Sequence, residues 1–321
     1  MVQVRAGRHC ARMSPDPTLR TSNLIGILSL CAGVMVFSLQ DAILKGLSGS
    51  HAVTLAIVLR SVVGLPILLV MVHYESGLKS LRSSNWWALV ARGLTLLVAY
   101  TTYYMAFPAL PLAEAVALFF TSPIFVTLLA WIFLKERVTP LAWVAVAAGF
   151  IGVLIILQPG TGLFKPAALL SLFSAAAYAL AMVLARKFGS REPTTVMAFY
   201  VNGVYLVGAS IIASLVMLLG IEPTGNPSFD FLVRPWAMPD MTDMFLMGVC
   251  GVIAAVAMSL ITHAYRMGNS NLVTVFEYTG MFWVTLWGYL LFAEVPQWTT
   301  VIGTTIIIAS GILAVRAART A

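Results

Sequence analysis

Six ionisable residues stand inside long apolar runs of the sequence or at their ends, where a charge is costly. An ionised side chain at the centre of a bilayer costs about 2.5–3.5 kcal/mol on the insertion scale, so such residues mark substrate, ion or proton sites by default. They can bind an anion, balance a counter-charge or carry a proton. The six are Asp41, Arg60, Arg92, Glu114, His263 and Glu277.

Depth within the runs separates three of these residues. At a rise of about 1.5 Å per residue, Arg60 lies about 13 Å into its run, near the midplane of a bilayer. Arg92 and Glu277 come out about 9–10 Å deep from one and the same side. We therefore expect Arg92 to be the counter-ion of Glu277, and Tyr278 to line the same cavity. For Arg60 two readings stay open, a structural interhelical hydrogen bond and contact with a substrate.

Asp41, Glu114 and His263 fall nearer the ends of their runs, where water is closer. Asp41 and Glu114 are candidates for substrate contact, and solvation near an interface is the competing reading. His263 fits an interfacial position, with proton movement as the alternative. Asp41 and Glu277 are the two acids best suited to coupling a process to protons.

The composition is that of an integral membrane protein. Of the 321 residues, 60% are hydrophobic and only 10% are charged, against about 25% in soluble domains. The three cysteines form no CxxC or Cys/His cluster, so neither a disulfide framework nor a metal site is predicted. No GxGxxG, Walker A, HExxH or GxSxG motif occurs, which leaves nucleotide and hydrolytic chemistry without support. No cofactor is predicted.

Ten apolar runs are long enough to cross a bilayer as helices, and turn-forming segments such as "QPGTGLFKP" and "RMGNSN" separate them. The fold class predicted is therefore an all-α integral membrane protein with ten transmembrane helices. The runs are Leu24–Leu44, Ala52–Val72, Trp86–Phe107, Leu112–Leu134, Leu141–Leu157, Pro166–Ala185, Thr194–Leu219, Met241–Ala264, Leu272–Phe292 and Thr299–Val315.

The basic residues are distributed unevenly between the two sides of these spans. Of the 19 Lys and Arg, 14 fall on the side of the N-terminus, 3 on the other side and 2 within spans. The positive-inside rule then predicts that both termini are cytoplasmic. It also explains the formal net charge of +7 without a nucleic-acid partner. Residues 1–23 are basic and unpatterned, and we expect a disordered cytoplasmic tail.

The second half of the sequence repeats the first. "SPIFVTLLAWIFLKE" (122–136) aligns with "GMFWVTLWGYLLFAE" (280–294) at an offset of 158, with Glu136 over Glu294. Near the start of each half an offset of 142 places Lys45 over Lys187. Five spans is an odd number, so the second half enters the membrane in the opposite sense. Inverted repeats of this kind are typical of secondary transporters, with the substrate site at the interface of the repeats.

Residues 110–160, "LPLAEAVALFFTSPIFVTLLAWIFLKERVTPLAWVAVAAGFIGVLIILQPG", resemble the first repeat of EamA-type proteins in the drug/metabolite transporter superfamily. Residues 263–313 are similar to the second repeat, with Gly280-Met281 in place of Ser122-Pro123. The resemblance implies two inverted five-helix repeats around a central cavity, over 24–160 and 166–316. It implies no single substrate, because the superfamily moves amino acids, nucleosides, cofactors, sugars and toxic metabolites.

The leading hypothesis is therefore a transporter that moves a small organic metabolite across the bacterial inner (plasma) membrane by alternating access. Two buried arginines favour a polar or anionic cargo of the amino-acid or cofactor-like kind. The alternative is a membrane-embedded enzyme acting on a lipid-linked substrate, and a structural or signalling membrane protein is a third reading. The expected partners are the small-molecule substrate and the lipid bilayer, with proton coupling through the acids and no nucleic acid. The sequence does not indicate an oligomeric state.

Overall fold

The protein is helical throughout the part that the structure describes. The computed structural model describes residues 17–135, 139–158, 164–187, 192–267 and 276–317, and no strand occurs in these ranges. In chain order the elements are α1 (Pro17–Leu47), α2 (Val53–Glu75), η1 (Leu78–Leu81), α3 (Trp86–Met105), α4 (Leu112–Phe119), α5 (Ser122–Leu134), α6 (Pro140–Leu157), α7 (Ala167–Lys187), α8 (Thr194–Leu218), α9 (Pro227–Val233), α10 (Met241–Met267), η2 (Phe276–Thr279), α12 (Gly280–Phe292) and α13 (Trp298–Ala317).

Length and hydropathy make the chain a multi-pass membrane protein. Within the described residues, seven helical stretches are long and apolar enough to cross a bilayer. They are Leu24–Leu47, Val53–Glu75, Leu112–Phe133, Pro140–Leu157, Ala167–Leu184, Thr194–Leu218 and Met241–Ile261. Each coincides with a predicted span. The count of ten spans stays a prediction.

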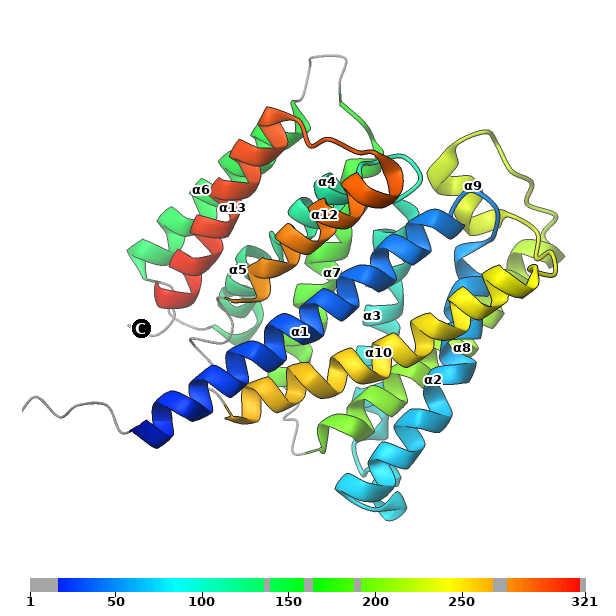
Figure 1. Cartoon of the computed structure of the whole chain (residues 1–321), viewed down its shortest axis with the longest axis horizontal. Coiled ribbons are helices and arrows are strands. Elements are labelled where there is room, and N and C mark those ends of the chain that lie inside the picture. The colour runs from blue at the N-terminus through cyan, green and yellow to red at the C-terminus, as the bar shows by residue number, and fades with distance from the viewer. Residues whose placement is uncertain (1–16, 136–138, 159–163, 188–191, 268–275, 318–321) are drawn as a thin grey trace, which may run out of the picture.

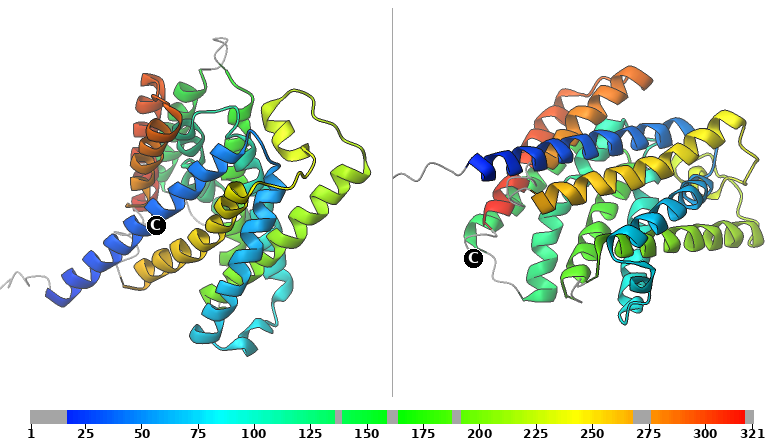
Figure 2. Two further views of the ribbon diagram at one scale, coloured as in Figure 1. Left: turned by 45° about the vertical axis from the view of Figure 1, so that its right-hand side comes forward. Right: turned by 60° about the horizontal axis from the view of Figure 1, so that its bottom comes forward.

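The two halves of the chain interleave. The most extensively packed pairs are α1 with α10, α6 with α13, α2 with α8, and α3 with α7 (Figure 1). Each pair joins a helix that precedes residue 160 to one that follows it. The start of α1 and the end of α13 lie toward the same side of the bundle, as the turned views also show (Figure 2).

Glycines let the α6–α13 pair pack backbone against backbone. A Cβ on Gly152 would lie 2.8 Å from the Gly303 carbonyl oxygen, and a Cβ on Gly303 would lie 2.7 Å from that of Gly152. Real Cβ atoms do not approach that closely. Small residues are the usual means of close helix approach in membranes, where no hydrophobic force drives helices together.

Two helices begin in the interior of the bundle after a break. The predicted fourth span is interrupted at 120–121, and α5 starts with Pro123 in its first turn. The helix α12 starts at Gly280 directly after the 3-10 turn η2. Each of the two helices is 13 residues long, and each is followed by a left-handed residue, Lys135 (φ 53°) and Ala293 (φ 52°).

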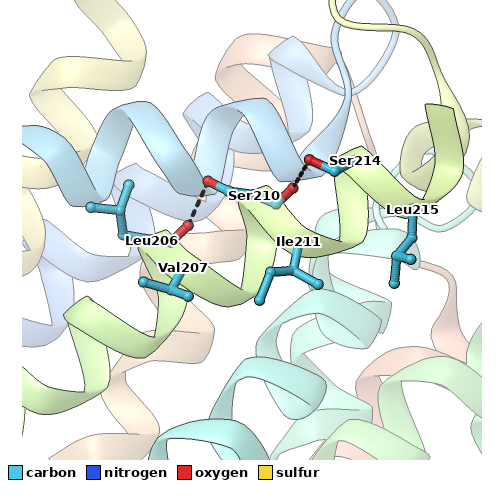
Figure 3. Close-up of a pocket in the computed structure, with 6 residues that line it drawn as sticks. All are labelled: Leu206, Val207, Ser210, Ile211, Ser214 and Leu215. Carbon is cyan, nitrogen blue, oxygen red and sulfur yellow. Dashed lines mark hydrogen bonds between the residues drawn. The ribbon is translucent and has the colours of Figure 1, made fainter. Parts of the chain in front are cut away.

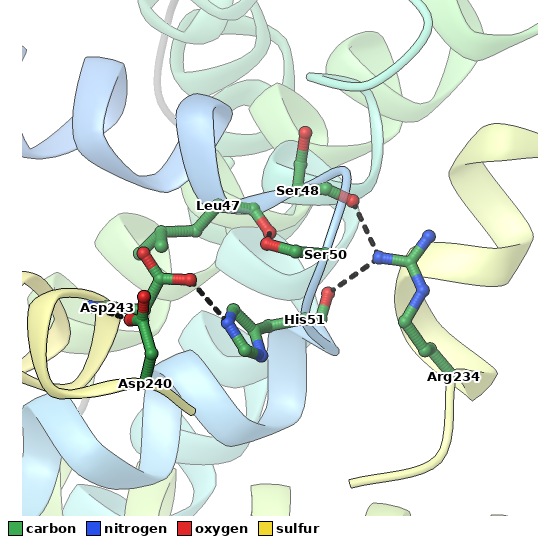
Figure 4. Close-up of polar contacts among 7 residues, drawn as sticks. All are labelled: Leu47, Ser48, Ser50, His51, Arg234, Asp240 and Asp243. Carbon is green, nitrogen blue, oxygen red and sulfur yellow. Dashed lines mark hydrogen bonds and ion pairs between the residues drawn. The ribbon is translucent and has the colours of Figure 1, made fainter. Parts of the chain in front are cut away.

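The connection that precedes α10 is fastened to the turn between α1 and α2. Arg234 Nη1 donates to the carbonyl oxygens of Ser48 and His51 at 3.0 and 3.1 Å (Figure 4). His51 Nε2 pairs with Asp243 Oδ2 in α10 at 2.6 Å. These contacts hold the end of α1 beside the start of α10.

Candidate functional site

The polar contacts in the interior of the bundle centre on Arg60 in α2. This residue is only 6% exposed, and its Nη1 donates to Tyr104 Oη at 3.0 Å. The fully buried Gln40 in α1 completes a triangle. With the amide oriented by its neighbours, Gln40 Oε1 accepts from Arg60 Nη1 and Tyr104 Oη, and Nε2 donates to the Cys250 carbonyl at 3.0 Å. Helices α1, α2, α3 and α10 thus meet at one hydrogen-bonded group.

An aromatic cluster surrounds Tyr100 in α3. The rings with centroids 6.0–6.4 Å from that of Tyr100 belong to Tyr103, Tyr104, Phe119, Tyr178 and Tyr205. They come from α3, α4, α7 and α8, so both halves of the chain contribute. Tilted and edge-on ring pairs at these distances are the favoured aromatic arrangements. The cluster therefore forms one packed unit at the interface of the halves.

Both predicted arginines border the aromatic cluster. Arg60 Cζ lies 5.4 Å from the ring centroid of Tyr205 and 5.8 Å from that of Tyr104, within the range of cation–π attraction. The half-buried Arg92 lies near enough to Tyr178, Tyr205 and Tyr100 for its charge to act on them. The Nε atom of each arginine is buried and has no hydrogen-bond partner among the described atoms. Buried donors are nearly always bonded, so these two N–H groups need an explanation.

Asp41 reaches the same region from α1. Tyr103 Oη donates to Asp41 Oδ2 at 3.1 Å, and the Arg60 charge acts on the carboxylate. In the described part of the chain, no Lys, Arg or His nitrogen lies within 4.0 Å of this carboxylate. The structure thus brings Asp41, Arg60 and Arg92 to one aromatic cluster.

Glu277 and Tyr278 lie on η2, and the charge of Glu277 acts on Tyr100 in the aromatic cluster. The Glu277 side chain is exposed. The Tyr278 ring packs edge-on against Phe120 with centroids 5.4 Å apart, and its buried hydroxyl lies against Gly311 without a hydrogen-bond partner among the described atoms. The pairing of Glu277 with Arg92 stays a prediction.

Glu114 belongs to a different group of charges. It stands in the first turn of α4, where the charges of Lys45, Lys165 and Glu294 act on it. This group is at the end of the bundle where α1 ends, hereafter the Lys45 end. His263 is exposed, and its Nδ1 hydrogen-bonds with Ser29 Oγ in α1 at 3.2 Å.

Sequence reasoning missed the uncharged members of the site. Gln40 is fully buried, yet a single amide in an apolar run gives no signal that separates it from a structural hydrogen bond. Tyr100, Tyr178 and Tyr205 come from three helices, and only the fold brings their rings together. The one available signal was the run "YTTYYM" (100–105), which places three tyrosines within five residues of a span.

A shallow groove lies on α8. It is lined by Leu206, Val207, Ser210, Ile211, Ser214 and Leu215 (Figure 3). Both serine hydroxyls donate to carbonyl oxygens one turn earlier in α8, at 2.7 and 2.9 Å. Their polar atoms are therefore satisfied within the helix, as a lipid-facing surface requires. The groove is apolar and presents no charged group, so we do not assign it to substrate.

These observations bear on two kinds of site, a metal site and a site for an organic anion. No group of three or more His, Cys, Asp or Glu side chains able to hold a metal ion occurs within the described ranges. What the central residues offer instead is a pair of guanidinium groups, a carboxylate and a cluster of tyrosine rings in edge-on and tilted contact. This set can recognise a small organic anion with a flat or polar body.

Comparison with known proteins assigns the chain to a family. The model of the EamA-like transporter family matches it twice, over residues 24–158 and 165–316. An S-adenosylmethionine uptake transporter of Rickettsia felis is 26% identical over 242 residues, which cover 75% of this chain and 76% of that protein. A riboflavin transporter of Vibrio cholerae is 30% identical over 209 residues, which cover 64% of this chain and 63% of that protein.

Two further likenesses extend over more of the chain. A pseudopaline exporter of Pseudomonas aeruginosa is 26% identical over 288 residues, which cover 88% of this chain and 93% of that protein. A solved crystal structure shares the fold with a TM-score of 0.58 at 20% identity, and the match covers 94% of this chain and 98% of that one.

Proposed function

Because the chain belongs to the EamA-like transporter family, it is a transporter of small metabolites rather than an enzyme, and we propose that its cargo is polar or anionic. The observation that carries this proposal is the pair of arginines beside the aromatic cluster, each with a buried Nε atom that no described residue accepts from. Guanidinium groups recognise carboxylates and phosphates through planar, charge-assisted hydrogen bonds. A cargo with such a group would supply the missing acceptors.

The two arginines differ in how much of each is free to bind. Arg60 is nearly fully buried, and its Nη1 is already held by Tyr104 and Gln40. Arg92 is less buried, and its charge acts on Tyr178 and Tyr205. We therefore assign direct cargo contact to Arg92, and to Arg60 the role of holding the cluster together while it contributes positive charge.

The aromatic cluster favours a cargo that also has a flat or cationic part. Tyrosine rings stack on heteroaromatic rings and attract cations over their faces. S-adenosylmethionine, named for one relative, has a carboxylate, an adenine ring and a sulfonium cation, and riboflavin, named for another, has a flat ring system. A cofactor-like or amino-acid-like metabolite therefore fits this site better than a sugar.

Four further residues belong to the proposed path at lower rank. Asp41 lies in the network of Tyr103 beside Arg60, which makes it the best placed acid for proton coupling. Tyr278 has a buried hydroxyl with no partner among the described atoms. This hydroxyl could donate a second hydrogen bond to an oxygen of the cargo. Glu277 and Glu114 are proposed to lie along the path on either side of the centre.

Alternating access through two inverted repeats is supported by three observations. α5 and α12 have equal lengths at an offset of 158, and α6 and α13 start at that same offset. The helix contacts also repeat: α1 packs on α10 and α12, while α7, its counterpart after five spans, packs on α3 and α5. Phe120 touches Tyr278, its own equivalent at that offset, as residues near a two-fold axis do. The proposed repeats span 24–160 and 166–316.

Location in the bacterial inner membrane, with ten spans and both termini in the cytoplasm, is part of the same proposal. The charge distribution of 14 against 3 basic residues supports it. The start of α1 and the end of α13 lie toward one side, as an even number of spans requires (Figure 1). The Lys45 end would then face outward.

The test is uptake into proteoliposomes from a bacterial metabolite extract, read by mass spectrometry without a chosen substrate. The wild-type protein should accumulate at least one anionic or zwitterionic metabolite above protein-free liposomes. Arg92→Gln should lower that uptake about tenfold or more, since a charge-assisted hydrogen bond contributes about 1.5–3 kcal/mol and tenfold corresponds to about 1.4 kcal/mol. Arg82→Gln, the same loss of charge at an exposed residue between α2 and α3, is the matched control. Equal uptake by both variants would refute the role of Arg92.

A further inference from the structure

The Lys45 end of the bundle is closed by an ion pair that joins the two halves of the chain. Lys45 Nζ lies 2.5 Å from Glu294 Oε1 and also donates to the Leu110 carbonyl oxygen at 2.5 Å. The other carboxylate oxygen, Glu294 Oε2, accepts from the Leu112 backbone N–H at 2.8 Å. The side chains of Lys45 and Glu294 are 10% and 22% exposed.

The position of Glu294 is fixed by the way α12 ends. Ala293 adopts a left-handed conformation, and the Glu294 N–H donates to the Gly288 carbonyl at 3.0 Å. The chain therefore turns back, so that the carboxylate lies over the last turn of α12. A Cβ on Gly288 would lie 3.2 Å from Glu294 Oε2, so glycine leaves room for this arrangement.

The elements joined in this way are the ones that alternating access would separate. Lys45 is at the end of α1, and Leu110 and Leu112 lie at the start of α4, all in the first half. Glu294 follows α12, in the second half. α1, α4 and α12 all contact one another. Phe119, the last residue of α4, belongs to the aromatic cluster. A path from this end to the cluster would have to pass between these helices.

We propose that Lys45 and Glu294 form a latch that holds the path shut at this end and releases it during transport. The inference rests on the alternating-access part of the proposed function. In the repeat alignment Lys45 corresponds to Lys187 and Glu294 to Glu136, so the same residue types recur in the other half. Glu136 and the Lys187 side chain lie outside the described part of the structure, and the proposal concerns the Lys45–Glu294 pair alone.

A latch and a permanent structural tie differ in what happens at the far end of the bundle. If this end opens only when the other closes, breaking the latch must tighten the opposite end. If the pair merely stabilises the fold, breaking it loosens its surroundings and nothing elsewhere gains protection. Hydrogen–deuterium exchange of the full-length protein in lipid nanodiscs reads both ends at once and needs no substrate.

Glu294→Gln is the variant of choice, because the amide oxygen still accepts from Leu112 while the charge is lost. We expect exchange in residues 106–116 and 288–297 to become about tenfold faster, equivalent to about 1.4 kcal/mol. Exchange in residues 128–135 and 180–187, at the opposite end, should become slower. The matched control is Asp243→Asn, which breaks the pair between His51, in the turn from α1 to α2, and α10, and should leave the opposite end unchanged.

Charge reversal provides the second variant. Lys45→Glu alone should behave like Glu294→Gln, and the double variant Lys45→Glu/Glu294→Lys should restore part of the wild-type exchange at both ends. Faster exchange near the pair without slower exchange at the opposite end would overturn the latch. Faster exchange near the pair together with slower exchange at the opposite end would support the latch. If the same protein moved no metabolite, the proposed cargo would be contradicted but the latch would not.

Discussion

Gly251 in α10 allows the closest approach between α10 and α2, directly at Arg60. A Cβ at this position would lie 2.3 Å from the Arg60 carbonyl oxygen, 3.0 Å from Val63 Cβ and 3.1 Å from the Gly64 nitrogen. Two of these atoms are backbone, which no side-chain rotation can move away. Gly251→Ala therefore requires α10 and α2 to part by about 1 Å, since ordinary contacts begin near 3.4 Å.

The expected cost follows from two opposing terms. Overpacking a well-packed interior lowers the free energy of unfolding by about 1–3 kcal/mol. Alanine in place of a mid-helix glycine raises it by about 0.5–1 kcal/mol. The two ranges give a net destabilisation of about 0–2.5 kcal/mol, centred near 1 kcal/mol. The displacement also separates Arg60 from the Cys250 carbonyl network, because Gly251 is the next residue in α10. Transport should therefore fall more than stability alone would explain.

Gly248→Ala is the matched control on the same helix. Its Cβ would meet only Val63 Cγ2 at 3.6 Å, an ordinary contact. Equilibrium unfolding in mixed micelles should show a lower free energy of unfolding for Gly251→Ala, and an unchanged or slightly higher one for Gly248→Ala. Equal stability of the two variants would refute the packing argument.

Three further predictions concern the site and its orientation. Tyr104→Phe leaves Arg60 with one fewer buried partner and should cost about 1–3 kcal/mol of unfolding free energy while the protein still inserts, which the same unfolding assay measures. A reporter fused after Pro227 should report the outside and one after Met267 the cytoplasm, and a cytoplasmic signal at Pro227 would contradict the inverted repeats. Asp41→Asn should retain the exchange of substrate across the proteoliposome membrane but lose uptake driven by a pH gradient. Gradient-driven uptake at the wild-type rate would refute a role of Asp41 in proton coupling.

Hydropathy predicted the helices well because a bilayer leaves few alternatives to a continuous apolar helix. The run Met241–Ala264 became α10 and Thr194–Leu219 became α8, with ends that differ by three residues or fewer. The break at 120–121 and the turn before Gly280 were not predicted as boundaries, since the sequence is apolar on both sides of each. Apolar composition reports burial in lipid and not whether the backbone stays helical.

The candidate site was predictable only where it is charged. Arg60, Arg92 and Asp41 stood out because charge is expensive in an apolar run, and the structure brings them to one cluster. Gln40 and the tyrosines carry no comparable cost, so their positions in the sequence say little about their contacts. The Lys45–Glu294 pair depends on a contact across 249 residues of chain, 294 minus 45, which periodicity cannot indicate.

The position of a bound cargo tests the central claim most directly. Once uptake has identified a metabolite, a cryo-electron microscopy structure of the wild-type protein in nanodiscs with that metabolite will locate it. The account predicts density for its anionic group within hydrogen-bonding distance of the Arg92 guanidinium, with its body against Tyr178 and Tyr205. Density in the α8 groove of Leu206 to Leu215, or at any place that leaves Arg92 without a ligand contact, would contradict it.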